Sequence, residues 1–428
     1  MARTNNNIIA SMDIGTTKVS VVVGEMGPDG VLHILGEGSA PSHGLKEGEI
    51  KDIEKTAHSI QEALNAAEDI SGYKISRVYV GIAGGHITGV NSNGIIKIHG
   101  NSVTDKDMAR VLESAKALAI PPERKVIHVL PQEYTIDDQR YISNPLGMAG
   151  TRLTANVHII TGRDASIKNI MRACEECGLE VEEVVLESLA SAHAVLSPSE
   201  RKNGVILIDM GGGTSDILII AEDAVKYTGE VPMGGEHMTN DIVRMLRASR
   251  EGAELIKIRH GCVLDSMVQP AEQIEVPEIL SEHAPHMVQR SVLAMVCQSR
   301  MEEIFSLIEQ NLNASGFKEQ AVGGVVLTGG ASLIRGCREL AEDMFGMPAR
   351  IGYPVNVGGM KEMVDDPKFS TVVGLLRYGA EQERKRGGNA RKNKAGGRTR
   401  TMEAEGPKTS ERLGRWFRAL WQWIKDVR

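Results

Sequence analysis

The chain has 428 residues, of which 41% are hydrophobic and 25% charged, and its formal net charge is -7. This length exceeds what one ordinary core supports, so we expect two or more domains or a large two-lobed fold. The first residues lack a basic region followed by an apolar run, and no apolar run reaches the roughly 18 residues that a spanning helix needs. We therefore expect neither a secretory signal nor a membrane-spanning helix.

Apolar runs of strand length alternate with longer helical patterns along the chain. The runs end in glycine-rich or acidic turns, as strands do. The helical patterns repeat apolar residues at spacings of three and four. The predicted strands lie in residues 18–26, 77–83, 156–162, 204–213, 215–223 and 323–332, and the predicted helices in 52–70, 164–178 and 292–312. This order predicts an α/β fold whose sheets are covered by helices.

Five cysteines, an odd number, are scattered through the chain. Without an export signal they indicate reduced thiols in a cytoplasm. Cys174 and Cys177 form a lone CxxC, whereas zinc normally needs a second pair or histidines at matching spacing. We interpret this pair as helix packing and expect no metal there.

Charge is distributed unevenly. Residues 381–428 contain 14 Lys and Arg against 6 Asp and Glu, whereas residues 1–380 contain 35 basic and 50 acidic side chains. Residues 381–409 have almost no bulky apolar side chain, and such a segment cannot offset the entropy lost on ordering. We expect a flexible basic linker over 381–409 and interpret its charge as belonging to a tether, not to a nucleic-acid site.

Two glycine-rich hairpins share one plan. In the first hairpin, a predicted strand that contains Asp13 is followed by the turn 15–18 and a second strand. In the second hairpin, a predicted strand that contains Asp209 is followed by the turn 211–214 and a second strand. Glycine N–H groups and the threonine hydroxyls of both turns suit phosphate oxygens. The two carboxylates suit Mg²⁺ held through water. The repetition predicts two related lobes.

A third strand runs into Gly329 and Gly330, and we expect a helix to begin near Ser332 and to seat a phosphate or a sugar. Each motif alone is explained by a tight turn that needs glycine. The three in this order favour nucleotide binding. The chain lacks GxxxxGK[ST] and lacks GxGxxG after a strand, which excludes P-loop and dinucleotide-binding folds.

These residues resemble the superfamily of actin, Hsp70 and sugar kinases. "DIGTTKV" and "DMGGGTSD" are similar to its two phosphate loops, and "LTGGAS" is similar to its adenosine motif. "VLESLASAHAVL" and "STVVGLLRYGA" match its two connecting helices, whose small residues would let them cross closely. The resemblance implies a two-lobed actin-like ATPase fold built from duplicated ribonuclease-H-like domains.

Within that superfamily the chain resembles the FtsA family of bacterial cell-division proteins over essentially its whole length. The matching stretches are "SHGLKEGEIKDIEKT", "RVYVGIAGGHITGVNSNG", "PMGGEHMTNDI" and "GAELIKIRHG". The resemblance implies subdomains 1A at 1–85 and 163–200, 1C at 86–162, 2A at 201–237 and 314–380, and 2B at 238–313, followed by the linker and a membrane-targeting helix at 410–428. Within 1C, the sequence predicts a helix that opens at Thr104, a Pro-Pro stop and then a strand.

The resemblance also implies site residues for ATP and Mg²⁺, with hydrolysis weak or absent. Asp13 and Asp209 would hold Mg²⁺ through water. Glu187 matches an acid that orders water in hydrolysing relatives, although a helix N-terminal acid favoured by the dipole is an equal alternative. The implied nucleotide-binding residues are Gly15, Thr16, Thr17, Lys18, Gly211, Gly212, Gly213, Thr214, Gly235, Glu254, Lys257, Arg300, Gly329 and Gly330. Glu254 and Lys257 are also explained as an exposed charge pair three residues apart.

The last residues predict an amphipathic helix that contains all three tryptophans of the chain. On a helical wheel one arc of about 160° is apolar and the opposite arc is polar and cationic. Such a helix on a long tether is typical of one that lies in the headgroup plane of an anionic membrane. The apolar arc holds Leu413, Trp416, Phe417, Leu420, Trp421, Trp423, Ile424 and Val427, and the cations are Arg415, Arg418 and Lys425.

By resemblance, the protein would polymerise on the cytoplasmic face of the cell membrane at the division septum as a peripheral protein. It would bind the C-terminal tail of the tubulin-like protein FtsZ through 2B and other division proteins through 1C. Three alternatives stay open: a sugar or acetate kinase, an Hsp70-like chaperone, and a relative of the pilus-assembly actins. A kinase needs a further catalytic acid, a chaperone needs a β-rich substrate domain, and the pilus protein is shorter and generally lacks the terminal helix.

Overall fold

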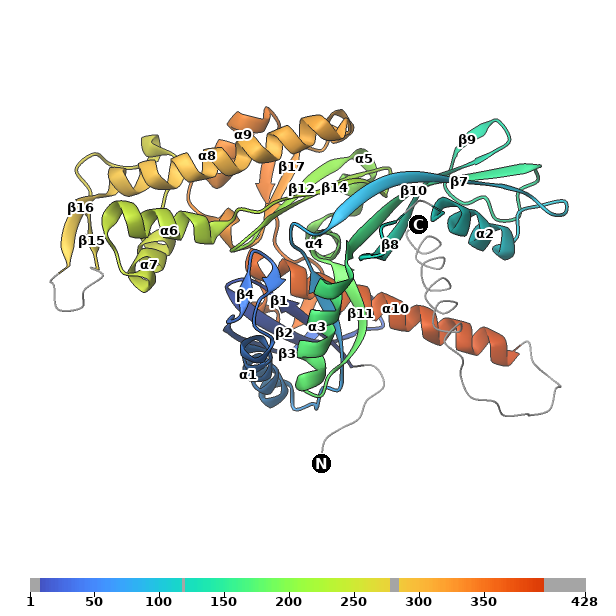
Figure 1. The fold of residues 1–428 in the computed structure, drawn as a ribbon, viewed down its shortest axis with the longest axis horizontal. Helices are drawn as coiled ribbons and strands as arrows, with labels where there is room; N and C mark the ends of the chain where they lie inside the picture. The colour runs from blue at the N-terminus through green and yellow to red at the C-terminus, as the bar shows by residue number, and fades with distance from the viewer. Residues whose placement is uncertain (1–7, 118–119, 278–284, 396–428) are drawn as a thin grey trace.

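The computed structural model describes residues 8–117, 120–277 and 285–395 (Figure 1). It confirms the α/β class, the two related lobes and an inserted subdomain. The predicted membrane-targeting helix at 410–428 and the linker beyond residue 395 lie outside the described residues. No helix within these three ranges is long and apolar enough to cross a bilayer.

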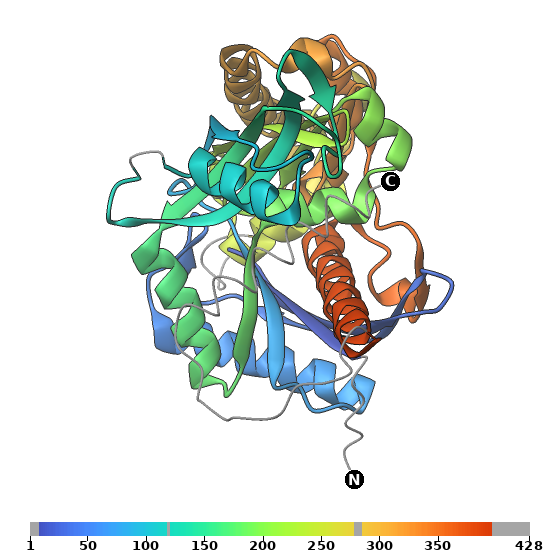
Figure 2. The same ribbon diagram turned by 90° about the vertical axis from the view of Figure 1, so that its right-hand side faces the viewer.

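The first lobe is built on a six-stranded sheet in the order β11-β6-β1-β2-β3-β19. Helix α1 (Ile53–Ser71) packs on β2 and β3, next to α3 (Asp164–Glu176), and α10 (Ser370–Ala395) packs on the opposite face (Figure 2). The strands are β1 (Ile9–Ile14), β2 (Lys18–Met26), β3 (Leu32–Pro41), β6 (Arg77–Ile82), β11 (Glu180–Leu186) and β19 (Val357–Gly359). Cys174 lies fully buried in this core, which confirms the packing interpretation of the CxxC pair.

The inserted subdomain is a four-stranded sheet in the order β7-β10-β8-β9, with one helix, α2 (Asp105–Ala115), on one face. Its strands are β7 (Thr88–Lys97), β8 (Arg124–Ile136), β9 (Gln139–Ile142) and β10 (Arg152–Arg163). Thr104 caps the helix, and Asp107 completes a capping box, as the predicted helix start requires. The helix at Thr104 and the strand after the prolines are therefore confirmed.

The insertion contacts both lobes. In the first lobe, the ring nitrogen Nε2 of His128 accepts a hydrogen bond of 3.0 Å from the backbone N–H of Leu186, directly before helix α4 (Glu187–Val195). In the second lobe, Nε2 of His158 lies 2.9 Å from the hydroxyl of Thr228 on β14 (Ala224–Val231). Both histidines are buried, and burial lowers the pKa of each to about 4, so both bonds involve neutral rings.

The second lobe repeats the plan with a five-stranded sheet in the order β14-β13-β12-β17-β18. Its strands are β12 (Val205–Met210), β13 (Ser215–Ala221), β14 (Ala224–Val231), β17 (Val325–Thr328) and β18 (Ala349–Ile351). Helices α6 (Gly235–Leu246), α8 (Arg290–Ser315) and α9 (Cys337–Phe345) share its buried core. Helix α7 (Arg250–His260) and the hairpin of β15 (Gln273–Val276) and β16 (His286–Gln289) lie farther out (Figure 1).

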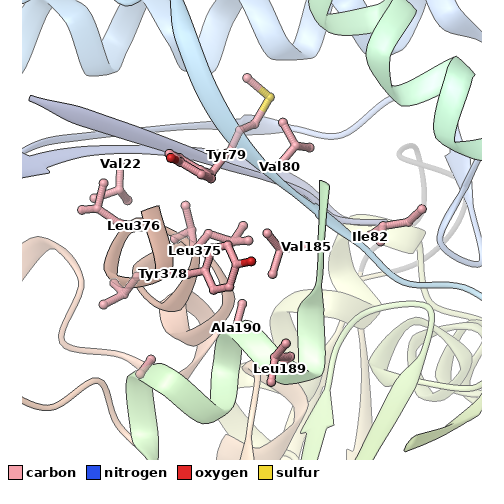
Figure 3. Packing of buried hydrophobic residues seen from close by; sticks show 14 of the residues in the cluster. Val22, Tyr79, Val80, Ile82, Val185, Leu189, Ala190, Leu375, Leu376 and Tyr378 are labelled. Atoms are coloured by element: carbon pink, nitrogen blue, oxygen red, sulfur yellow. The ribbon is translucent and has the colours of Figure 1, made fainter. Parts of the chain in front are cut away.

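Two connecting helices, α4 (Glu187–Val195) and α10, cross between the lobes (Figure 3). A Cβ on Gly374 would lie well under 3.0 Å from the backbone carbonyl of Ala190, so only glycine permits this approach. Tyr378, one turn further along α10, stacks edge-on against Tyr79 at 6.3 Å. The predicted close crossing of small residues is confirmed.

The end of the chain differs from the prediction in two ways. Helix α10 continues to Ala395, although we expected the flexible linker to begin at Glu381. The buried first turns of this helix provide a nucleus, and the Glu, Gln, Arg and Lys residues at 381–386 favour its extension. We assigned residues 314–380 to 2A, but β19 pairs with β3 and α10 covers β1, β2 and β6 of the first lobe.

Candidate functional site

The two predicted phosphate loops face each other between the lobes. The turns are equivalent, because Gly15 N–H donates to the carbonyl of Lys18 at 3.0 Å and Gly211 N–H donates to the carbonyl of Thr214 at 2.9 Å. A Cβ on Gly213 would lie 2.5 Å from the hydroxyl oxygen of Thr16, and one on Gly212 would overlap Thr17. The structure therefore brings both loops together, and glycine is required for their approach.

Two buried aspartates lie near the ends of equivalent strands in the two lobes. Asp13 is the second-to-last residue of β1, Asp209 is the second-to-last residue of β12, and each is at most 9% exposed. The pKa of Asp13 is raised to about 6, because burial and the nearby charge of Asp209 raise it more than the charge of Lys18 lowers it. Burial also raises the pKa of Asp209, although hydrogen bonds from Ser191 and Thr371 oppose that shift.

Among the described residues, Oδ1 of Asp13 and the ammonium of Lys18 are buried without a hydrogen-bond partner. The Lys18 ammonium lies 3.6 Å from the ring centroid of Phe369, and burial lowers its pKa to about 8. An unpaired carboxylate oxygen suits a hydrated cation, and an unpaired ammonium suits a phosphate. These residues therefore fit a magnesium nucleotide.

Three further carboxylates lie behind the aspartates: Glu187 at the start of α4, Asp216 on β13 and Glu230 on β14. Burial and the neighbouring acids raise the pKa of Glu187 well above its usual range, and the same causes act on Asp216. Burial raises the pKa of Glu230 to about 7, while a hydrogen bond of 2.9 Å from the N–H of Gly84 opposes the shift. The environment thus favours the protonated form of these groups.

Two members of this cluster, Asp216 and Glu230, are not among the site residues predicted from the sequence. A signal for Asp216 existed, because strands that flank the turn 211–214 must pair Asp209 with Asp216, and the observed register does so. Asp216 in turn pairs with Glu230 on the next strand. Alternation along the strands then places all three side chains on one face of the sheet.

This cluster predicts a pH dependence of stability. A raised pKa means that the folded protein binds protons that the unfolded chain releases, so the stabilisation is present below the unfolded pKa and is lost as pH rises through the folded pKa. For Glu230 that window runs from 4.5 to about 7. The free energy of unfolding of the ligand-free protein should therefore fall across this window, and less steeply in Glu230→Gln, whose amide oxygen can still accept from Gly84. Urea unfolding at several pH values checks this; equal slopes for both proteins would contradict it.

Four predicted nucleotide residues converge at the start of α6. A Cβ on Gly235 would lie 3.3 Å from the Cβ of Ala331, directly after Gly330, and 3.6 Å from Nζ of Lys257. Lys257 donates to the carbonyl of Gly235 at 3.1 Å and to Glu254 at 2.7 Å. The structure therefore brings Gly235, Glu254, Lys257 and Gly330 together. The ion pair between Glu254 and Lys257, which was the alternative explanation for these two residues, also forms.

Arg300 is engaged elsewhere. On α8 its guanidinium makes a bidentate pair with Asp241 of α6 at 2.5 and 3.0 Å and contacts Glu303 at 2.5 Å. These bonds hold α8 against α6. Within the described part of the chain, no hydrogen bond or ion pair of Arg300 joins it to Gly235 or Lys257.

The third glycine motif lies beside Asp209. Gly329 has φ +80, and a Cβ there would lie 2.5 Å from Oδ1 of Asp209. The predicted helix near Ser332 is wrong: residues Gly330–Leu333 form a single 3-10 turn, and α9 begins only at Cys337. The left-handed Gly336, with φ +85, separates the two segments.

A surface cavity of about 380 Å³ lies away from these residues, on the open face of the inserted sheet. Its lining includes Glu133, Asp137, Arg140 and Arg152. It contains none of the predicted nucleotide residues.

Solved structures with this architecture include actin-like proteins. A type IV pilus biogenesis complex, PilM-PilN, matches with a TM-score of 0.64 at 16% identity, covering 87% of this chain and 98% of that chain. MreB5 of Spiroplasma citri bound to ADP matches with a TM-score of 0.54 at 15% identity, covering 91% and 99%. Identities this low show the fold alone, and the fold is actin-like.

Sequence comparisons are more specific. The family model "Cell division protein FtsA" matches residues 206–374, and the model "SHS2 domain inserted in FTSA" matches residues 84–161. Cell division protein FtsA of Pseudomonas aeruginosa is 43% identical over 379 residues, covering 89% of this chain and 91% of the relative. FtsA of Escherichia coli K12 is 39% identical over 385 residues, covering 88% and 91%. The chain therefore belongs to the FtsA family of cell division proteins.

Proposed function

We propose that this protein binds Mg-ATP between its lobes, assembles into filaments on the cytoplasmic face of the membrane, and anchors FtsZ there. The observation that carries the nucleotide part is the facing pair of phosphate loops. Between them an unpaired carboxylate oxygen of Asp13 and an unpaired ammonium of Lys18 are buried among the described residues. Buried polar atoms without partners are rare in native proteins, and a ligand that pairs with them accounts for both.

In the proposed complex, backbone N–H groups of turns 15–18 and 211–214 other than those of Gly15 and Gly211 bind phosphate oxygens, and the Lys18 ammonium neutralises phosphate charge. Asp13 and Asp209 hold water molecules of the cation. Mg²⁺ supplies the positive charge that lets two buried carboxylates and a triphosphate share one site. Because one loop comes from each lobe, a bound nucleotide favours the closed arrangement of the lobes.

We propose that hydrolysis is slow, and the surroundings of Glu187 in the ligand-free protein support this. A general base must be ionised to accept a proton from water, whereas burial and the neighbouring acids raise the pKa of Glu187 well above its usual range and favour its protonated form. Its side chain also packs on Gly81, where a Cβ would lie 2.8 Å from Cγ of Glu187. Nucleotide binding is therefore proposed to act as an assembly signal.

The membrane part of the proposal depends on the terminal amphipathic sequence. One short helix with an apolar face binds a bilayer reversibly, whereas a filament presents many helices at once, and the combined avidity exceeds that of any single helix. ATP-driven assembly would therefore control membrane attachment. Cell-division function is shared by the whole family, whereas the FtsZ tail as ligand of 2B and other division proteins as ligands of 1C remain proposals.

The kinase and chaperone alternatives have no specific support. An FtsA relative matches 89% of this chain, and the family models match residues 84–161 and 206–374, so the comparisons favour neither alternative. The pilus protein shares the fold at 16% identity, far below the 43% identity of the FtsA relative.

Calorimetric titration of the full chain with ATP tests the nucleotide site directly. Binding is expected to be tighter with Mg²⁺ than with EDTA, because the cation screens Asp13 and Asp209 from the phosphates. Titration with ADP measures how much the terminal phosphate contributes to the affinity, and titration with GTP measures how much the adenine base contributes. Absence of binding by any of these nucleotides in Mg²⁺ would contradict the proposal.

A further inference from the structure

Two hydroxyls of the connecting helices bind one oxygen of Asp209. Ser191 of α4 donates to Oδ2 of Asp209, and Thr371 of α10 donates to the same oxygen at 3.1 Å. The two hydroxyl oxygens lie 3.0 Å apart, and because each hydroxyl donates its single proton to Asp209, they are neighbours around that oxygen and not donors to each other. Ser191 is fully buried, and the other two residues are 8% exposed.

This arrangement leaves the two oxygens of Asp209 with different tasks. Oδ2 accepts a hydrogen bond from each of the two hydroxyls, and these bonds fix the orientation of the carboxylate group. Oδ1 faces Gly329, where a Cβ would lie 2.5 Å away, so a larger residue at 329 would cover it. Oδ2 is therefore occupied by the two hydroxyls, whereas Oδ1 stays accessible to a ligand.

The same turn of α10 is attached to both lobes. Ser370 bonds to Thr328 at the end of β17 at 2.7 Å, which ties the helix start to the second lobe. One residue after Thr371, the carbonyl of Val372 accepts a hydrogen bond of 2.7 Å from Ser11 of β1 in the first lobe. Asp209 thus bonds to the point where α10 passes from one lobe to the other.

We propose that Ser191 and Thr371 are positioning residues that hold Asp209 in the orientation required by the cation of the nucleotide, and that they connect the metal end of the site to the crossing of α4 and α10. This inference rests on the proposed nucleotide site and goes beyond it, because neither residue is among those predicted to bind the nucleotide or its cation. Groups that orient a metal-binding carboxylate typically change metal affinity by about 10- to 100-fold when they are removed.

The test compares ATP affinity in Mg²⁺ and in EDTA for single variants of the full chain. Thr371→Val and Ser191→Ala should each weaken Mg-ATP binding by about 10-fold or more and leave ATP binding in EDTA unchanged. Thr371→Ser, which keeps the hydroxyl, should restore the wild-type ratio of the two affinities.

Ser370→Ala is the matched control, because it removes a buried hydroxyl from the same helical turn that bonds to Thr328 and not to Asp209. It should keep the wild-type ratio even if it lowers the melting temperature. A wild-type ratio in Thr371→Val and Ser191→Ala, or an equal loss in Ser370→Ala, would overturn the inference while the nucleotide site stands. A wild-type protein that binds no nucleotide would overturn the proposed function and this inference together.

Discussion

Replacing Gly374 with alanine is expected to have the largest effect on stability of any single methyl addition in the connecting helices. The new Cβ would overlap the carbonyl of Ala190, and both partners are backbone segments of buried helices that cannot rotate away. Overpacking of a well-packed core destabilises by roughly 1 to 3 kcal/mol where side chains can yield, so we expect about 3 kcal/mol or more here. Thermal unfolding of the ligand-free full chain measures the loss.

Gly85→Ala is the control for this substitution, because a Cβ at Gly85 meets no atom within 4 Å and its backbone is not left-handed. It should melt close to the wild type. A Gly374→Ala protein that also melts close to the wild type would show that α4 and α10 do not cross as described.

Replacing Asp209 with alanine is expected to separate stability from nucleotide binding. The substitution removes a buried charge that burial disfavours, and the hydroxyls of Ser191 and Thr371 can then bond to each other. The ligand-free protein should therefore remain folded with a melting temperature at or above that of the wild type. Affinity for Mg-ATP should fall by at least about 10- to 100-fold, because one of two carboxylates for the cation is lost.

Asp209→Asn refines this experiment, since the amide oxygen preserves the acceptor for both hydroxyls but carries no charge. It should show the same loss of Mg-ATP affinity. If Asp209→Ala binds Mg-ATP and polymerises like the wild type, the nucleotide switch in this account is wrong.

The strands and helices of the two lobes were predictable because each of them packs on the core of its own lobe, and this burial requires a regular spacing of apolar residues along the element. The runs at 18–26 and 215–223 become β2 and β13, and the helical pattern at 292–312 becomes α8. The glycine motifs were predictable for the same kind of reason, since only glycine satisfies the contacts that Gly213 and Gly374 make.

The errors arose where distant contacts override local pattern. Polar composition suggested that order ends at Glu381, yet α10 is nucleated by packing on the first lobe and continues to Ala395. Composition also could not reveal that residues 357–359 pair with β3, because a three-residue strand carries no periodic signal. The helix expected at Ser332 failed because Gly336 adopts a left-handed conformation that local pattern does not specify.

The carboxylate cluster was predictable only in part. Asp216 follows from hairpin register, whereas Glu230 depends on the register of a second hairpin that contains a bulge. The hydroxyls at Ser191 and Thr371 meet across 180 positions of the sequence, and no local pattern relates them.

Flotation with anionic liposomes tests the central claim most directly, by comparing the full chain with residues 1–408, each with and without Mg-ATP. The account predicts that only the full chain floats, that Mg-ATP increases its bound fraction, and that this increase is absent in Asp209→Ala. Equal flotation of the full chain and of residues 1–408, or binding that does not respond to Mg-ATP, would contradict a nucleotide-controlled membrane anchor.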